Sequence, residues 1–353
     1  MAAARRPTIS DVARSAGVSK GAVSFALNDR PGVAPETRDR ILAAAAELGW
    51  TPSHRARALA ASRSLAVGLV VRRPPETLGA DPFFPSFIAG IESTLSPLGQ
   101  ALLLQVVPDR DRELDGYRKL AADGRVDGVF LTDLRVDDPR PDLLAALGLP
   151  AVWIGPFCTD ENRPCVAVDD RPGIVAAVTH LVDLGHQVIA HVAGPDEFVH
   201  GVSRREAWAG ALHAAGLAEG PCVRSDFSAQ GGADATKALL DLPVPPTAIV
   251  YANDLMATAG MAVAASRGLD VPGDLSITGF DDTEVSAHLQ PALTTVRTDA
   301  YAWGQAAAKR LMANVEGRGA PNVSLPPPYL VVRASTAPPQ EQPAQVRHET
   351  EQR

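Results

Sequence analysis

The chain has 353 residues, which is longer than a typical single domain, so we expect two or three domains. Of these residues 46% are apolar, as in globular proteins. No apolar run approaches the ~18 residues of a membrane span, so the composition argues against a helical membrane protein. The net charge of −8 is uneven: residues 1–63 hold ten Lys/Arg and five Asp/Glu, and the rest holds 23 and 36, so we expect only the basic head to meet a polyanion.

A short helix and a tight turn are predicted at the start of the chain. Thr8, followed three residues later by Asp11, resembles a capping box for a helix over 9–16. Gly17 ends this helix. The local pattern therefore predicts a helix followed by a turn rather than a secretory signal, since no apolar stretch follows the two N-terminal arginines.

Two further helices are predicted before residue 52. Ser19 caps the second helix, whose inward residues are Val23, Ala26 and Leu27. Its outward residues are Lys20, Gly21, Ala22, Ser24, Phe25 and Asn28. The third helix starts at residues 34–36 and carries an apolar face made of Ile41, Leu42, Ala45 and Leu48. Two helices joined by a glycine-containing turn and braced by a third predict a helix-turn-helix domain over 1–52, which fits a DNA major groove.

Residues 53–64 and 336–353 flank the body and differ from it in composition. The segment 53–64 forms a helix pattern without a continuous apolar face, so we expect a hinge that is disordered until a partner orders it. The tail 336–353 is rich in Pro, Gln and Glu and is also expected to be disordered.

The body, residues 65–335, alternates apolar runs with amphipathic stretches. The predicted strands are 66–71, 101–107, 126–132, 151–155, 187–194, 247–253, 275–282 and 329–333. The predicted helices lie near 85–98, 111–123, 171–185, 204–216, 230–241, 254–268 and 298–316. Apolar strands joined by helices indicate parallel sheets covered on both faces, and their number over 270 residues favours two sheets.

The stretch from Thr8 to Ser64 resembles the DNA-binding head of the LacI (lactose-repressor) family from end to end. The body continues the resemblance with GLVV, PFF, HLVDLGH, YANDLMA, GFDDTEVSAHLQPALTTV and AAAKRLM in the family's order. The resemblance implies an all-α helix-turn-helix head plus an α/β, type I periplasmic-binding-protein-like body of two Rossmann-like lobes. The body would then bind the effector and form the dimer, and the chain would cross between its two lobes near residues 169, 297 and 325.

The same resemblance implies a cytoplasmic, nucleoid-associated transcriptional repressor that binds double-stranded operator DNA as a homodimer or a dimer of dimers. The lack of a C-terminal heptad repeat favours the dimer. In the family, the second helix reads base edges, here with Lys20, Gly21 and Ser24, with Ala22, Phe25 and Asn28 beside them. The phosphate-contact positions match Thr8, Ser19 and Thr37. In the hinge, Leu59 matches a minor-groove wedge and Arg57 suits a phosphate.

The resemblance also implies a sugar-like effector between the lobes, beyond the carboxyl ends of the strands. Asp281 would accept hydrogen bonds from it, Arg204 would donate, and Asn253 would do both. Phe84 and Phe227 would stack on its ring. Several roles stay open: Arg205 competes with Arg204, and Phe84 is also a candidate core residue. Asp282, and likewise Asp169 and Asp170, either cap helices or contact the ligand.

Other classes of function are disfavoured by the residue patterns. Residues 17–21 satisfy G-x-S-x-G, but no strand precedes them, so they are not a nucleophile elbow. Asp281 and Asp282 lack an accompanying nucleophile, and His180, His186 and His191 lack metal-ligand spacing, so we expect no enzyme, metal or cofactor. Three alternatives remain. The effector could be a nucleobase or nucleoside, it could act as a corepressor that tightens DNA binding, or the chain could be a transport-type binding protein.

The three cysteines are Cys158, Cys165 and Cys222. Their odd number and irregular spacing argue against a disulfide framework or a zinc site. We therefore expect unpaired thiols in a reducing cytoplasm.

Overall fold

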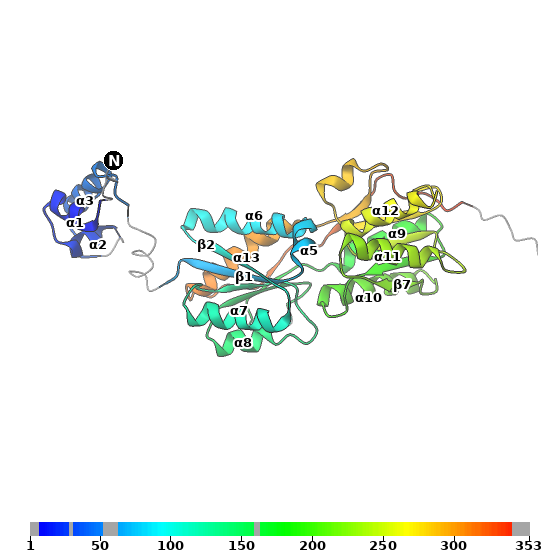
Figure 1. Ribbon diagram of the computed structural model, residues 1–353, viewed down its shortest axis with the longest axis horizontal. Helices are drawn as coiled ribbons and strands as arrows, with labels where there is room; N and C mark the ends of the chain where they lie inside the picture. The colour runs from blue at the N-terminus through cyan, green and yellow to red at the C-terminus, as the bar shows by residue number, and fades with distance from the viewer. Residues whose placement is uncertain (1–6, 28–30, 52–62, 159–162, 341–353) are drawn as a thin grey trace, which may run out of the picture.

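The computed structural model describes residues 7–27, 31–51, 63–158 and 163–340, which form a small helical head and a larger α/β body (Figure 1). Asn28, Arg57 and Leu59 of the proposed DNA-contact set lie outside these residues. None of the helices in the described part combines the length and apolarity needed to cross a membrane.

The head consists of α1 (Ile9–Ala16), α2 (Lys20–Leu27) and α3 (Pro35–Glu47). The predicted caps are confirmed: the Asp11 carboxylate accepts hydrogen bonds from the backbone N–H and the hydroxyl of Thr8, at 2.9 and 2.7 Å. The Ser19 hydroxyl accepts from the Ala22 N–H at 3.1 Å. Gly17 has φ +66°, a left-handed conformation that suits glycine and turns the chain from α1 into α2.

The interior of the head differs from the sequence prediction at two positions. Leu42 is 45% exposed, so it does not belong to the buried face of α3, where Ile41, Ala44 and Ala45 pack instead. Ala22 is half-buried against the head core rather than facing outward. The helix phase places both residues at the edge of the apolar stripe, where a sequence pattern separates faces least clearly.

The N-terminal lobe is built on a parallel six-stranded sheet in the order β11-β5-β4-β3-β1-β2. The strands are β1 (Ala66–Arg72), β2 (Ala101–Val107), β3 (Val129–Leu131), β4 (Ala151–Gly155), β5 (Cys165–Ala167) and β11 (Val323–Ser324). The helices are α5 (Pro75–Ala80), α6 (Phe83–Leu95), α7 (Arg110–Ala122), α8 (Arg140–Ala146) and α13 (Ala300–Val315), with a 3-10 turn at Ser96–Leu98. Helices α6 and α13 cover one face of the sheet, and α7 and α8 cover the other (Figure 1).

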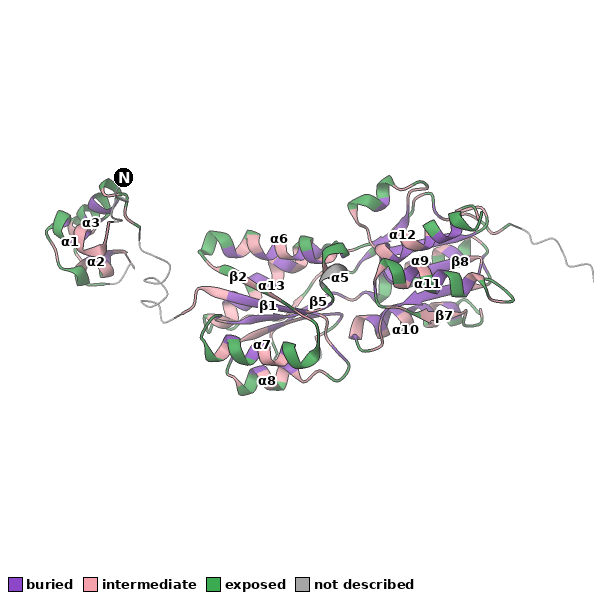
Figure 2. Ribbon diagram, in the orientation of Figure 1, coloured by how far each residue is buried: buried purple, intermediate pink, exposed green. Residues whose placement is uncertain are grey.

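The C-terminal lobe repeats this plan with the strand order β12-β10-β9-β8-β6-β7. Its strands are β6 (Ile189–Ala193), β7 (Cys222–Arg224), β8 (Ala248–Tyr251), β9 (Ser276–Asp281), β10 (Thr294–Arg297) and β12 (Tyr329–Val331), of which only β12 pairs antiparallel. Its helices are α9 (Arg171–Asp183), α10 (Val199–Ala214), α11 (Ala229–Leu240) and α12 (Asp254–Ser266), with a 3-10 turn at Glu284–His288. Buried strands lie between helices that expose only their outer faces (Figure 2).

The chain passes between the lobes at 168–170, 298–299 and 325–328, because β5, β10 and β11 are each followed by an element of the other lobe. The second crossing sends α13 back onto α6. Both sheets therefore direct the carboxyl ends of their parallel strands toward the space between the lobes, where open α/β sheets bind ligands.

The C-terminal tail and the cysteines differ from the predictions. Residues 336–340 are ordered against the C-terminal lobe: the hydroxyl of Thr336 lies 2.9 Å from His180 Nε2, and the carbonyl of Ala337 lies 3.0 Å from His186 Nε2. Residues 341–353 lie outside the described part.

Cys158 and Cys165 form a disulfide, so the expectation of unpaired thiols is wrong for these two. Cys158 follows β4 and Cys165 begins β5. These strands are neighbours in the sheet, so the residue after one and the first residue of the other lie close enough for their sulfur atoms to bond. Only Cys222 keeps a free thiol among the described cysteines, and it is exposed.

Candidate functional site

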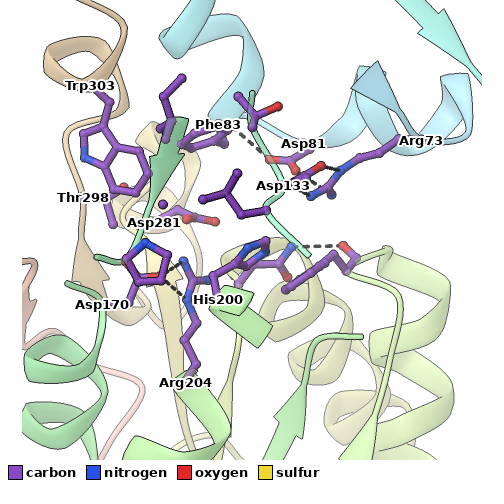
Figure 3. Close-up of a pocket in the computed structure, with 17 residues that line it drawn as sticks. Arg73, Asp81, Phe83, Asp133, Asp170, His200, Arg204, Asp281, Thr298 and Trp303 are labelled. Atoms are coloured by element: carbon purple, nitrogen blue, oxygen red, sulfur yellow. Dashed lines mark hydrogen bonds and ion pairs between the residues drawn. The ribbon is translucent and has the colours of Figure 1, made fainter. Parts of the chain in front are cut away.

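A cleft lies between the two lobes (Figure 3). The space inside it, counted with the part that is open to solvent, is about 730 Å³. The residues that line it are Arg73, Asp81, Phe83, Thr132, Asp133, Leu134, Ile154, Gly155, Pro156, Asp170, His200, Arg204, Phe227, Asn253, Asp281, Thr298 and Trp303. Most of them end a strand or lie within three residues after one, so the two sheets determine where their side chains lie.

On the side of the N-terminal lobe, Arg73 and two carboxylates form a buried ion cluster. Arg73 donates to both oxygens of Asp133 at 2.9 Å, and its Nη1 donates to Asp81 at 3.3 Å. Burial alone would raise the pKa of Asp133, but the guanidinium of Arg73 outweighs it and lowers this pKa to about 2. Asp133 is therefore ionised at every physiological pH.

On the side of the C-terminal lobe, Arg204 of α10 is held by Asp170 and by a backbone carbonyl. Its Nε and Nη2 lie 2.8 and 2.7 Å from Asp170 Oδ2, and its Nη1 donates to the carbonyl of Ala252 at 2.7 Å. The ring centroid of Phe280 lies 3.7 Å from the centre of the guanidinium. Arg204 is thus fixed in position before any ligand arrives.

Asp281 ends β9 and points into the cleft (Figure 3). Its φ of +120° and the +55° of Asp282 turn the chain sharply here, a conformation that non-glycine residues rarely adopt. Burial raises the pKa of Asp281 well above its usual value, although nearby Arg204 acts in the opposite direction. No described residue donates a hydrogen bond to this carboxylate, so it is available to a ligand.

Aromatic rings form two walls of the cleft. Phe227 stacks on His200 at 5.4 Å between ring centroids, and His200 stacks on Phe198 at the same distance. Burial lowers the pKa of His200 to about 3, so this ring is uncharged at neutral pH. Across the cleft, Phe83 and Trp303 meet edge to face at 5.5 Å. Rings next to carboxylates suit a ligand with apolar faces and a polar edge.

Comparison with known proteins shows which family this two-part chain belongs to. A family model described as bacterial regulatory proteins, lacI family, matches residues 8–53, and a periplasmic binding protein-like domain matches residues 178–336. The transcriptional regulator CelR of Thermobifida fusca is 35% identical over 338 residues, covering 94% of this chain and 98% of that protein. The chain belongs to the lacI family of bacterial regulatory proteins.

Other relatives and solved structures agree with this assignment. The repressor CytR of Escherichia coli K12 is 32% identical over 333 residues, 93% of this chain and 96% of that protein. The lac repressor dimer bound to operator and the anti-inducer ONPF has a TM-score of 0.81 at 31% identity, covering 94% of this chain and all of that one. A CelR–cellobiose complex has a TM-score of 0.72 at 33% identity and the same coverage. As a lacI-family member the chain is a DNA-binding transcriptional regulator, not an enzyme.

Four of the five effector residues predicted from the family resemblance line one cleft, namely Arg204, Phe227, Asn253 and Asp281. Asn253 lines it with its amide already engaged: Oδ1 accepts from the Met256 N–H at 2.9 Å and Nδ2 donates to the Phe227 carbonyl at 3.0 Å. It therefore caps α12 and orients Phe227. We expect it to position the site rather than to bind the effector directly.

Phe84 does not line the cleft; it is 1% exposed within the core of the N-terminal lobe. Its neighbour Phe83 faces the cleft instead, because the first turn of α6 presents consecutive residues to different sides. The guanidinium of Arg73 covers the Phe84 ring at 5.3 Å, so Phe84 supports the site from behind.

The remaining open roles are decided by ion pairs. Arg205 turns away from the cleft and pairs with Asp196. Asp282 is not among the residues that line the cleft, and its carboxylate pairs with Arg297 and Arg333 rather than with the N-terminus of a helix.

The other adjacent pair, Asp169 and Asp170, divides between the surface and the cleft. Asp169 binds Arg171 on the surface, whereas Asp170 lines the cleft and binds Arg204.

Six charged or aromatic cleft residues were not predicted from the sequence: Arg73, Asp81, Phe83, Asp133, His200 and Trp303. Arg73 and Asp133 could have been found, because they follow predicted apolar strands, where ligand sites of such sheets lie. The other four lie on helices or just before them, and the sequence pattern does not distinguish them.

In the head, α2 presents Lys20, Gly21 and Phe25 to solvent, and Phe25 is 42% exposed. Ser24 is half-buried. Among the proposed phosphate contacts, Ser19 is exposed, while Thr8 and Thr37 are half-buried. An apolar ring of this size left exposed on the second helix is available for contact with DNA.

Proposed function

We propose that the chain is a homodimeric repressor that binds a near-palindromic operator and releases it when a sugar-like effector fills the cleft. The observation that carries this proposal is the polar and aromatic cleft where the chain crosses between lobes, joined in one chain to a helix-turn-helix head. A ligand there contacts both lobes at once and so biases their relative arrangement.

For the DNA end, we propose that α2 enters the major groove with Lys20, Gly21, Ser24, Phe25 and Asn28 toward the bases. Ala22, which packs partly on the head core, would lie at the edge of this face. Thr8, Ser19, Thr37 and Arg57 would contact phosphates, and Leu59 would wedge into the minor groove. The excess of ten basic over five acidic residues in 1–63 supports this orientation. The protein would act on the chromosome, associated with the nucleoid of the cytoplasm.

For the effector end, we propose that Asp281 accepts hydrogen bonds from ligand hydroxyls. Arg204, already fixed by Asp170, would direct any remaining N–H toward ligand oxygens. Phe227 and Phe83 would pack against the apolar faces of the sugar ring. That CelR has been solved with cellobiose supports a sugar as the class to test first.

The DNA proposal is tested by selecting genomic fragments with the purified protein and footprinting the bound sites. We expect protection of a near-palindrome and a steep loss of affinity with salt. Lys20→Ala should weaken specific binding, and the control Lys119→Ala, on the body, should not. Absence of any site-specific protection would refute the proposal.

The effector proposal is tested by thermal shift with a panel of mono- and disaccharides and nucleosides, followed by release of the selected DNA. A sugar should stabilise the wild type and release DNA, and Asp281→Ala should abolish both effects. Asp234→Ala, an exposed carboxylate on α11, is the control. Stabilisation by nucleosides alone, or tighter DNA binding with ligand, would overturn the sugar or the release part of the proposal.

A further inference from the structure

The charges that line the effector cleft do not balance. Four carboxylates, Asp81, Asp133, Asp170 and Asp281, face two guanidinium groups, Arg73 and Arg204. His200 adds no positive charge, because burial lowers its pKa to about 3. The residues described as lining the cleft include no lysine.

Neither arginine offers an uncompensated positive charge. In Arg73, Nε and Nη2 donate to Asp133 and Nη1 donates to Asp81. In Arg204, Nε and Nη2 meet Asp170 and Nη1 donates to the Ala252 carbonyl. The N–H groups left on Nη1 and Nη2 can donate to a ligand, but the charge of each guanidinium is already matched by a buried carboxylate, so an anionic ligand finds no unpaired cation.

Asp281 is the carboxylate left without compensation. Two cations act on it, Arg204 and Arg73, and each is already bound to another carboxylate, Asp170 and Asp133 respectively. The remaining charges that act on Asp281 are carboxylates: Asp81, Asp170 and Asp254. Asp254, at the start of α12, is bonded to Thr283, Ser286 and Thr295 rather than to a cation, so it adds negative charge.

A second observation points to a ligand at the same place. Oδ1 of Asp170 is buried and has no hydrogen-bond partner among the described residues, and Asp170 itself is 1% exposed. Buried acceptors are normally satisfied, so the cleft offers unused acceptors but no unused cation.

We propose that the cleft selects its effector by charge, with Asp281 as the determinant: it takes hydroxylated rings that are neutral or carry an amine, and it rejects their phosphate and carboxylate forms. This inference rests on the proposed effector site. A hydroxyl or ammonium donates to Asp281 and relieves the unpaired charge, whereas a phosphate or carboxylate beside it meets like charge in a poorly solvated space.

The first test uses matched ligand series in isothermal titration: glucose, glucosamine, glucose 6-phosphate and glucuronate, and the same forms of any sugar that shifts the melting temperature. The neutral and amino forms should bind the wild type at least tenfold more tightly than the anionic forms. Asp281→Asn, which keeps the shape and tolerates the left-handed backbone, should reduce this discrimination at least tenfold. Equal binding of an anionic form to the wild type would overturn the inference.

The second test needs no ligand and compares Asp281→Asn with Asp133→Asn in thermal unfolding across pH. The pKa of Asp281 is raised in the folded state, so ionisation destabilises the fold above that pKa and the loss is recovered as the pH falls. Asp281→Asn should therefore raise the melting temperature by a few degrees at pH 8. Asp133→Asn should lower it, because Asp133 is paired with Arg73.

The two tests separate the two proposals. If Asp281→Asn destabilises the protein as Asp133→Asn does, the carboxylate is compensated and the charge inference is wrong. If no sugar of any series binds while Asp281→Asn stabilises the protein, the sugar effector of the proposed function is wrong. The same result would still show that the charge of Asp281 is uncompensated in the folded protein.

Discussion

At the scale of single residues, Arg140 connects a buried acid to the loop that carries Asp133. Its guanidinium donates to Glu113 Oε1 at 3.1 Å and to the carbonyls of Thr132 and Asp133 at 3.0 and 2.9 Å. Arg140 is 1% exposed and Glu113 fully buried. This network therefore fixes the backbone after β3, which lines the cleft, as well as neutralising a buried carboxylate.

Replacement of Arg140 by Met is expected to destabilise the protein by about 3–5 kcal/mol, because Asp138 loses its ion pair and two carbonyls lose their donor in the interior, while Glu113 keeps only Arg135 at close range. The control is Arg171→Met, whose pair with Asp169 lies at the surface, where solvent screens it, and should contribute little to stability. Urea unfolding measures both changes. Similar losses for the two variants would show that the buried network contributes no more than a surface pair.

His191 makes a second prediction at the residue scale. It is fully buried, and its Nδ1 lies 2.8 Å from the Val250 carbonyl. Burial lowers its pKa from 6.5 to about 4, so the unfolded chain takes up a proton at a higher pH than the folded one. The stability contributed by the neutral ring is complete above pH 6.5 and is lost as the pH falls to about 4. The free energy of unfolding decreases over this range by up to about 3 kcal/mol.

His191→Gln should therefore flatten the fall in unfolding free energy between pH 6.5 and 4 relative to the wild type. Denaturant unfolding at several pH values measures this slope. His288→Gln, at an exposed position, is the control and should follow the wild-type slope. A slope that His191→Gln leaves unaltered would assign the acid sensitivity to other groups.

At the scale of elements, α13 and α6 pack backbone against backbone through two glycines. A Cβ on Gly304 of α13 would lie 2.1 Å from the Phe87 carbonyl oxygen of α6. A Cβ on Gly90 of α6 would lie 2.1 Å from the Tyr301 carbonyl oxygen. Since neither backbone can move without its helix, this close approach holds the returning α13 on the N-terminal lobe.

Gly304→Ala is expected to destabilise the protein by about 3 kcal/mol, because the methyl group forces the two helices apart. Gly210→Ala in α10 is the matched control: a Cβ there meets nothing within 4 Å, so helix propensity predicts a gain of up to about 1 kcal/mol. Thermal and urea unfolding measure both signs. Equal effects would mean that the contact is loose in solution.

The elements also show how far the sequence predicts the fold. The long apolar runs, such as those that form β1 and β9, were predicted nearly to their ends because burial on both faces leaves a continuous signal. The strands β5, β7, β10 and β11 have two to four residues each and were missed, since so short a segment has no periodicity. Their existence depends on the neighbouring strand, which the local sequence does not contain.

The prediction of the site was limited in the same way: single residues were found, but contacts between residues distant in the sequence were not. Asp281 and Arg204 were found through the family resemblance, whereas the pairing of Arg73 with Asp133 joins residues 60 positions apart and depends on β1 and β3 being neighbours. The disulfide of Cys158 and Cys165 likewise depends on how β4 and β5 are placed. Spatial pairing across a sheet is the information that a single sequence lacks.

At the scale of the whole molecule, the lobes touch beside the cleft through backbone hydrogen bonds. The Val199 N–H donates to the Leu134 carbonyl at 2.8 Å, and the Val136 N–H donates to the Glu197 carbonyl at 3.1 Å. Arg72 of the N-terminal lobe pairs with Glu197 of the other lobe. These contacts lie away from the three crossings, so opening the cleft requires that they break while the crossings bend.

Val199→Pro separates this interlobe contact from the fold of the lobes. Val199 is the first residue of α10, where proline is tolerated, and Phe198 before it has φ −94° and ψ 132°, as a residue preceding proline prefers. The variant loses the bond to Leu134, worth about 1–2 kcal/mol in favour of the closed lobes. Hydrogen exchange at the Val136 N–H should therefore accelerate about tenfold, with global unfolding nearly unchanged. Val199→Ala keeps the N–H and should exchange like the wild type; if Val199→Pro does so too, this contact does not hold the lobes closed.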